Sequence, residues 1–314
     1  MLTFTIIMIS VVLPLYILYW LVNGRTVNKS QLIIKSFAAV LLIYTLFYFN
    51  NWATTSIYLR YLYILLCALA LGYAWWQAWE QPWRSPLPFR QWAPILGGIV
   101  LLSLCALVLA NIAGGDEVPG GAVEIEFPLQ RGTFFMAQAG SSQGLNGHMA
   151  VRDQPEYRGQ TWALDIVRLN LLGSRARGIY PGSPEAYYIF GTPVYSPCDG
   201  GVVATENELP DLNPPEKDRE NLAGNFVKIE CEEGFFVLLA HFRQGSLTVA
   251  EGDIVSAGSR LGAVGNSGNT TEPHLHIHAQ STEGEATLLD ADPLPIIFKG
   301  YDWLVRNDVI RTGR

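Results

Sequence analysis

The hydrophobic pattern divides the chain into an apolar first third and a mixed remainder. A helix needs about 20 mostly apolar residues to cross the hydrocarbon core of a bilayer. Four runs reach this length, at residues 2–22, 31–50, 57–79 and 92–113. The first run is too long for a cleaved signal peptide and lacks a basic start and a cleavage site. The pattern therefore predicts an α-helical membrane region of four spans in residues 1–114.

Two interpretations of the apolar third are a membrane region and four buried helices of a soluble core. The charge distribution favours the membrane region. Residues 1–114 hold six Lys/Arg and a single acid, Glu80, for a net charge of +5. So few acidic residues could not cover a soluble domain of this size. Tryptophans prefer the membrane–water interface, and seven of the nine lie near the ends of the proposed spans: Trp20, Trp52, Trp75, Trp76, Trp79, Trp83 and Trp92.

The loops between the proposed spans predict an orientation. The first loop carries Arg25 and Lys29, the third carries Arg84 and Arg90, and the second, at residues 50–56, has no charge. Basic loops stay in the cytoplasm. We therefore expect a multi-pass protein of the bacterial cytoplasmic (inner) membrane, with everything after the fourth span facing outward.

The remainder of the chain predicts a mainly-β domain. A glycine-rich stretch at residues 113–121 marks the boundary between the two parts of the chain. We interpret residues 115–129 as a linker followed by the first strand of the second part, an entry strand. Short runs rich in Val, Ile, Phe and Tyr are separated by Gly, Pro, Asn and Asp, as is typical of strands and turns. These runs are Val123–Phe127, Thr192–Tyr195, Gly201–Thr205, Phe226–Ile229 and Phe235–His241.

Two segments of this half have a less regular pattern. Residues 206–221 are polar, charged and contain three prolines, which predicts an exposed inserted loop. The residues after Tyr301 fit either a short helix or a tail, so residues 298–314 are assigned to a C-terminal tail.

The net charge of the second half excludes one class of partner. Residues 115–314 hold 15 Lys/Arg and 27 acids, a net of −12. Nucleic-acid binding needs clustered positive charge, so no nucleic-acid partner is expected. Protein partners are not indicated by any pattern.

All five histidines lie in this acidic half, at His148, His241, His274, His276 and His278. Imidazole is the commonest metal ligand and a general acid–base near neutral pH. In a strand, the three histidines of residues 274–278 would share one face, while Leu275 and Ile277 would face a core. By itself, a pair of histidines two residues apart does not distinguish a metal site from an exposed pair without function.

The residues around these histidines resemble a known family. The relevant segments are Gly191–Val194, Asp199–Val203, Gly224–Ile229, Leu239–Phe242, Glu251–Val255 and Gly265–His276, the last reading GNSGNTTEPHLH. Their order is similar to that of the lysostaphin- and LytM-type zinc metallopeptidases, which cleave peptides of bacterial peptidoglycan. The resemblance covers roughly residues 130–297 and implies a domain with an antiparallel sheet or sandwich of LytM type.

The resemblance implies a zinc site and two further histidines. Zn²⁺ would be held by His148, Asp165 and His276, while His241 and His274 would be catalytic histidines that do not bind the metal. One departure stands out, because sixteen residues separate His148 from Asp165 where the common motif is a compact HxxxD. The position of His278 is usually not a histidine in the family, so we interpret it as a bystander or a neighbour of a ligand.

A further implication concerns Cys198 and Cys231, the only cysteines of the outward half. In the family the two runs that carry them lie in the same region of a sheet. An oxidising compartment preserves disulfides, and a bridge needs Cα atoms within about 7 Å. A disulfide is therefore predicted, with two unrelated thiols as the alternative. Cys67 and Cys105 lie in proposed spans, where we expect them to pack as small apolar side chains.

These features relate the chain to three functions. The first is a membrane-anchored zinc endopeptidase that uses a zinc-activated water on peptidoglycan or another extracytoplasmic peptide, with the lipid bilayer as its second partner. The second is a non-catalytic binding or regulatory module of the envelope. The third, a biotinyl- or lipoyl-carrier domain, is disfavoured because no lysine lies between Lys228 and Lys299. HExxH and P-loop motifs are absent from the sequence.

Overall fold

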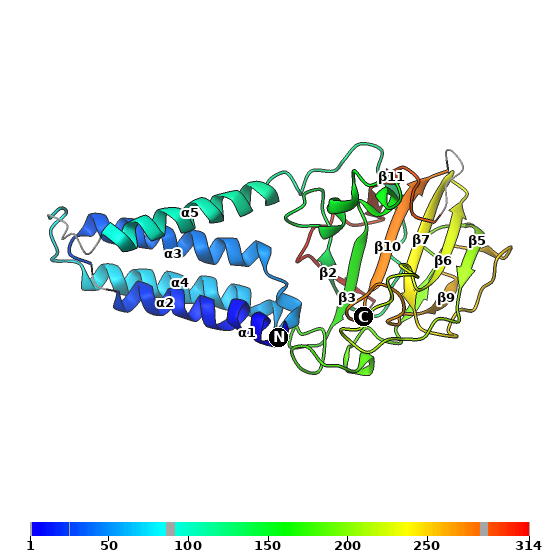
Figure 1. Ribbon diagram of the computed structural model, residues 1–314, viewed down its shortest axis with the longest axis horizontal. Coiled ribbons are helices and arrows are strands. Elements are labelled where there is room, and N and C mark those ends of the chain that lie inside the picture. Colours follow the sequence, from blue (N-terminus) through cyan, green and yellow to red (C-terminus); the bar gives the residue numbers. More distant parts are fainter. Residues whose placement is uncertain (1, 25, 86–91, 283–287, 314) are drawn as a thin grey trace. The chain divides into compact units, whose positions relative to one another are not determined.

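The computed structural model describes residues 2–24, 26–85, 92–282 and 288–313, with side chains omitted for residues 92–96. The chain forms two compact units, Met1–Ile112 and Ala113–Arg314. The first unit is helical and the second is built mainly of strands (Figure 1).

The helices of the first unit follow the apolar runs. They are α1 Leu2–Ile7, the π-helical turn Met8–Val12, α2 Leu13–Asn23, α3 Lys29–Phe49, the 3₁₀ turn Trp52–Thr54, α4 Ile57–Gln77 and α5 Trp92–Ile112. The π-helical turn ends just before Pro14. Proline has no N–H to donate to the carbonyl four residues earlier, and it crowds that carbonyl. A local widening of the helix at this position accommodates the defect.

Three of these helical segments are long and apolar enough to span a membrane: Leu2–Asn23, Lys29–Phe49 and Ile57–Gln77. They agree with the first three predicted spans. The fourth prediction falls on α5, whose described apolar part, Gly97–Ile112, is shorter than a span. A fourth span is therefore a proposal. Arg25 and Arg90, used above for orientation, lie outside the described residues.

Polar side chains near the helix ends satisfy the backbone groups that helices leave unpaired. Asn28 accepts a hydrogen bond from the N–H of Gln31 at the start of α3. The ammonium group of buried Lys35 donates to the carbonyls of Leu21 and Gly24, at 2.7 and 2.6 Å, where α2 ends. A cation at a helix C-terminus is electrostatically favoured, which explains how a lysine is accommodated among apolar helices.

The second unit contains a nine-stranded sheet with the order β13-β2-β3-β10-β7-β6-β5-β8, in which β11 also pairs with β10. Two small sheets, β1-β12 and β4-β9, accompany it. The strands are β1 Val123–Ile125, β2 Gly132–Gln138, β3 Leu164–Leu169, β4 Pro193–Tyr195, β5 Gly200–Glu206, β6 Asn225–Cys231, β7 Phe235–Phe242, β8 Ile254–Val255, β9 Arg260–Ala263, β10 Leu275–Ser281, β11 Pro293–Leu294, β12 Ile296–Phe298 and β13 Val309–Thr312.

The pairings within the main sheet are antiparallel. Alternation along β10 buries Leu275 and Ile277 completely in the main hydrophobic core, as predicted. Burying each such side chain stabilises the fold by about 1.5–3 kcal/mol. His276 and His278 consequently lie on the other face of the sheet, and both are buried there too.

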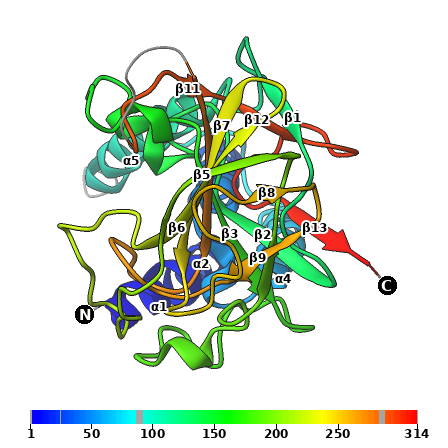
Figure 2. The ribbon, with the colours of Figure 1, turned by 90° about the vertical axis from the view of Figure 1, so that its right-hand side faces the viewer.

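The predicted strand runs are all found, with ends shifted by at most two residues. The residues after Tyr301, for which the sequence left helix and tail open, instead contain β13, which forms the edge of the main sheet beside β2 (Figure 2). Ile310 of β13 is buried in the core. This end of the chain therefore belongs structurally to the domain.

The segment 206–221 is exposed for much of its length, but hydrogen bonds hold it against the rest of the domain. The carboxylate of Asp211 accepts hydrogen bonds from the N–H groups of Asn266 and Gln244. The N–H of Asp218 donates to the carbonyl of Gly268. The predicted insertion is therefore an anchored loop that lies against residues 265–268.

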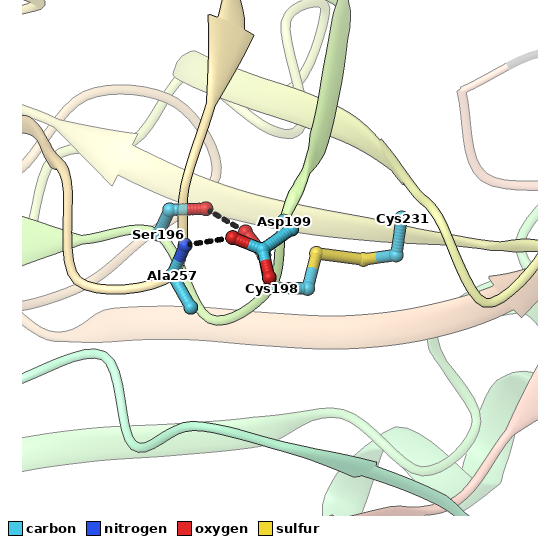
Figure 3. The surroundings of a disulfide bond; sticks show 5 residues. All are labelled: Ser196, Cys198, Asp199, Cys231 and Ala257. Carbon is cyan, nitrogen blue, oxygen red and sulfur yellow. Dashed lines mark hydrogen bonds between the residues drawn. A yellow bond between two sulfur atoms is a disulfide. The ribbon is translucent and has the colours of Figure 1, made fainter.

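Cys198 and Cys231 form the predicted disulfide, with their Cα atoms 5.8 Å apart (Figure 3). Cys231 is the last residue of β6 and pairs in register with Gly200 at the start of β5. The bend before β5 is also held by hydrogen bonds: the Ser196 hydroxyl donates to the carbonyl of Cys198, and the Ala257 N–H donates to the Asp199 carboxylate. The bridge thus joins neighbouring strands at a fixed turn.

Candidate active site

The five residues predicted from the sequence line one cavity of about 300 Å³ on the second unit. They come from three adjacent strands of the sheet and two flanking turns. The sheet contributes Asp165 from β3, His276 from β10 and His241 from β7. His148 lies on a short 3₁₀ turn, and His274 immediately precedes β10.

Asp165 and His276 are held together by the sheet itself. They are direct cross-strand partners of β3 and β10, so their side chains share a face. Nδ1 of His276 lies 3.0 Å from Oδ1 of Asp165. Because both residues sit on central strands, their geometry is fixed by the ladder.

His148 reaches Asp165 despite the sixteen intervening residues. Its Nε2 lies 3.0 Å from Oδ2 of Asp165. Asn146 positions the turn Gly147–Val151: its side-chain oxygen accepts from the N–H of His148, and its amide nitrogen donates to the carbonyls of Gly140 and Ala163. The intervening residues fold into 3₁₀ turns that bring the chain back to β3, so the wider spacing is compatible with a compact His–Asp pair.

His241 enters the cavity through a break in strand alternation. Its neighbour Ala240 is the register partner of His276, so regular alternation would turn His241 to the opposite face. The β6–β7 register shifts here, from Asn225↔Phe242 to Phe226↔Ala240, which leaves His241 as the extra residue of a β-bulge. Its φ of 66° is uncommon for a residue other than glycine. The bulge redirects the imidazole towards His274, with ring centroids 4.8 Å apart.

The ring orientations of His241 and His274 are set by backbone carbonyls. Nδ1 of His241 lies 2.8 Å from the carbonyl oxygen of Ser267, and Nδ1 of His274 lies 2.9 Å from that of Glu272. A carbonyl only accepts, so both Nδ1 atoms carry the proton. The Nε2 atom is then the one available for chemistry on each ring.

A buried ion pair supports the segment that carries His274. Arg175 is 1% exposed and donates through Nε to Oε1 of Glu272 at 2.8 Å, while a second guanidinium nitrogen also contacts that carboxylate. The hydroxyl of Tyr180 donates to the carbonyl of Thr271 at 2.7 Å. A loop far away in the sequence thus fixes the turn before β10.

The cavity holds a carboxylate with a lowered pKa and histidines whose pKa values shift in different directions. Burial raises the pKa of Asp165, but the neighbouring His148 and His274 outweigh it and hold that pKa well below its ordinary value. Burial lowers the pKa of His276 to about 4 and the pKa of His241 well below its ordinary value. For His274, burial lowers the pKa, but the Asp165 carboxylate reverses the effect and the pKa is raised.

This donor set fits a divalent zinc ion. The ligand atoms of His148, Asp165 and His276 lie within 4.8 Å of one another, as do those of His241, His274 and His276. An ionised carboxylate and neutral imidazoles are the ligand forms that zinc requires. The first group includes the carboxylate, whose negative charge is buried beside imidazoles.

His278 does not line the cavity. It is 1% exposed, and its Nδ1 lies 3.0 Å from Nε2 of His276. Sequence reasoning did not identify the residues that orient the site, namely Asn146, Arg175, Glu272 and Ser267. Only Asn146 left a recognisable local signal, since Asn commonly caps a helical turn through its side chain.

Part of the second unit is similar to a known protein family. Residues 186–287 match the model of peptidase family M23. The matched range includes His241, His274 and His276, while His148 and Asp165 precede it. This part of the second unit is therefore similar to peptidase family M23.

Individual proteins are similar to parts of this chain. Over 175 residues the chain is 37% identical to peptidoglycan DD-endopeptidase ShyA of Vibrio cholerae, covering 54% of this chain and 36% of the relative. Over 104 residues it is 31% identical to cell division protein DipM of Caulobacter vibrioides, covering 33% and 14% of the two chains. The chain thus spans about a third or less of the curated relatives it matches. The lysostaphin catalytic domain of Staphylococcus simulans is similar at 24% identity and a TM-score of 0.24, covering 34% of this chain and 77% of that chain.

Proposed function

We propose that this protein is a membrane-anchored zinc metalloendopeptidase that hydrolyses peptide bonds outside the membrane, in peptidoglycan. The main supporting observation is the cavity that gathers one ionised carboxylate and four imidazoles from distant parts of the chain. The M23 match and the endopeptidase relative support the reaction class. The apolar helices of the first unit support membrane anchoring.

In this proposal His148, Asp165 and His276 hold the metal. When bound, zinc would supply an activated water and polarise the scissile carbonyl. Of the two overlapping groups of donors, this one has the carboxylate that offsets the charge of the cation. It also leaves His241 and His274 free to act on the substrate.

The pKa values of the two remaining histidines shift in opposite directions, and we give the two residues different roles on this basis. Burial keeps His241 neutral, so its Nε2 lone pair accepts a proton from the attacking water. The pKa of His274 is raised, so its Nε2–H donates to the oxygen on which negative charge develops. The carbonyls of Ser267 and Glu272 accept from Nδ1 of the two rings, so Nε2 is the nitrogen available for these roles.

Zinc content and hydrolysis together test the proposal. Purified full-length protein in detergent should bind one zinc ion per chain and release soluble peptide fragments from isolated peptidoglycan, as detected by mass spectrometry. The His276→Ala variant should lose both properties, because it lacks a ligand on a central strand. Stoichiometric zinc retained at the same site in this variant would contradict the ligand assignment.

The same experiment separates the catalytic function from the alternative of a binding module. A zinc-loaded protein that sediments with peptidoglycan but releases no fragment would favour the non-catalytic alternative. The presence of both His241 and His274 in the cavity argues against that outcome.

A further inference from the structure

A buried histidine behind the proposed metal site has no role in the function described so far. His278 is two residues beyond His276 on β10 and is 1% exposed. Its Nδ1 lies 3.0 Å from Nε2 of His276. Its own Nε2 is buried and has no hydrogen-bond partner within the described part of the chain. An unpaired buried nitrogen is costly, so its retention needs an explanation.

The two nitrogens of His276 face different partners. Nδ1 faces the carboxylate of Asp165 and Nε2 faces His278, both at 3.0 Å. A neutral imidazole carries one proton, so a lone pair at Nδ1 requires the proton at Nε2. The residue that accepts a hydrogen bond from Nε2 therefore decides whether Nδ1 can bind a metal.

We propose that His278 is a positioning residue that fixes the metal-binding tautomer of His276. This inference rests on the proposed zinc site. In the zinc-loaded protein, His276 carries its proton on Nε2 and donates it to Nδ1 of His278, which carries its own proton on Nε2. The unpaired nitrogen of His278 is then a consequence of orienting the ligand.

In the metal-free protein the same pair adopts the opposite tautomers. Nδ1–H of His276 donates to the Asp165 carboxylate, and Nδ1–H of His278 donates to Nε2 of His276. Each ring holds one proton in both states, so the pair carries two protons before and after metal binding. His276 itself remains in place, because both hydrogen bonds use the same ring orientation.

The alternative of His278 as a direct ligand does not fit the geometry. Its Nδ1 is occupied by His276, and the residue lies outside the lining of the cavity. A bystander role does not fit either, because a buried apolar side chain would fill this position without an unpaired nitrogen.

Two substitutions separate the hydrogen bond from packing. His278→Leu fills the space but removes the acceptor. His278→Asn places a carbonyl oxygen the same number of bonds from Cβ as Nδ1, so it restores an acceptor for His276. Zinc affinity of the full-length protein, measured by competition with a chelating dye, should fall about 10–100-fold in the Leu variant. The Asn variant should recover most of that loss.

Imidazole nitrogen NMR gives a readout that packing alone would not change. In the zinc-loaded wild type, the spectrum should show a proton on Nε2 of His276 and on Nε2 of His278. A proton on Nδ1 of His278 in that state, or a Leu variant with wild-type zinc affinity, would overturn the proposal while leaving the zinc site intact. A wild-type protein that binds no zinc would overturn the proposed function as well.

Discussion

At the scale of single residues, the site depends on unusual local conformations. His241 reaches the cavity through a bulge and a positive φ, and His274 through a turn supported by the Arg175–Glu272 pair. Neither residue binds the metal in our proposal, although both line the cavity. Their substitution should therefore separate metal binding from catalysis.

His241→Ala and His274→Ala should retain one zinc ion and lose turnover. Removing a general base or a donor to a developing oxyanion lowers the rate by about a hundredfold or more. Zinc content and peptide release from peptidoglycan are the two measurements. Loss of zinc in either variant would instead place that histidine among the ligands.

The metal-free protein should become less stable as the pH falls from about 6.5 to 4. Folding lowers the pKa of His241, His276 and His278 below the ordinary value of 6.5, mainly through burial. The unfolded chain therefore binds more protons in this window, and acid shifts the equilibrium towards it. The raised pKa of His274 acts in the opposite direction but above this window, where its stabilising effect is lost as pH rises.

Urea unfolding of chelator-treated protein across this range checks the prediction. The free energy of unfolding should decrease steadily with falling pH. A constant value would mean that these histidines titrate alike in the folded and unfolded states. Zinc-loaded protein serves as the control, because a bound metal opposes protonation of its ligands.

At the scale of elements, the central strands β3 and β10 position residues of the site, and strands nearer the sheet edge contribute to stability. Asp165 and His276 are paired by the β3–β10 ladder. The disulfide fastens the other side of the sheet, where β5 and β6 pair. Its loss should therefore weaken the fold without removing the ligands.

The double variant Cys198→Ala/Cys231→Ala should have a free energy of unfolding lower by about 2–4 kcal/mol, because the bridge limits the unfolded chain. The cysteines are separated by 33 positions in the sequence. Zinc content should stay at the wild-type level.

Thiol labelling of the denatured, unreduced full-length protein checks the bridge directly. Two of the four cysteines, Cys67 and Cys105, should react. Labelling of all four would show that the bridge does not form.

At the scale of the whole molecule, the orientation of the chain in the bilayer decides which side of the membrane the peptidase unit can act on. We propose that the peptidase unit faces outward from the cytoplasmic membrane. A cysteine replacing Lys217, which is exposed in the anchored loop, should react with a membrane-impermeant maleimide in spheroplasts. A cysteine replacing exposed Arg84 should react only after the membrane is opened. Both variants are made in a Cys67→Ala/Cys105→Ala background, and the reverse pattern would overturn the cell-wall substrate.

Local patterns in the sequence were sufficient for the apolar helices, some of the strands and the residue types of the site. Hydrophobic runs predict helices because the length of a span is set by the bilayer, and alternation on β10 predicts which side chains enter the core. The segment around His274 and His276 resembles a known family strongly enough to nominate the ligands. These features depend on residues close together in the chain.

Tertiary structure decided what depends on distant contacts. The pairing of β3 with β10 brings His148 and Asp165 to His276 across more than a hundred residues, and the bulge reverses the face of His241. The edge strand β13 forms because β2 offers unpaired backbone groups, which the local pattern after Tyr301 does not reveal. The role of the contact between His276 and His278 depends on Asp165, because Asp165 determines which nitrogen of His276 faces the site. Register and burial depend on contacts between strands that are far apart in the chain. Local sequence patterns therefore do not predict them.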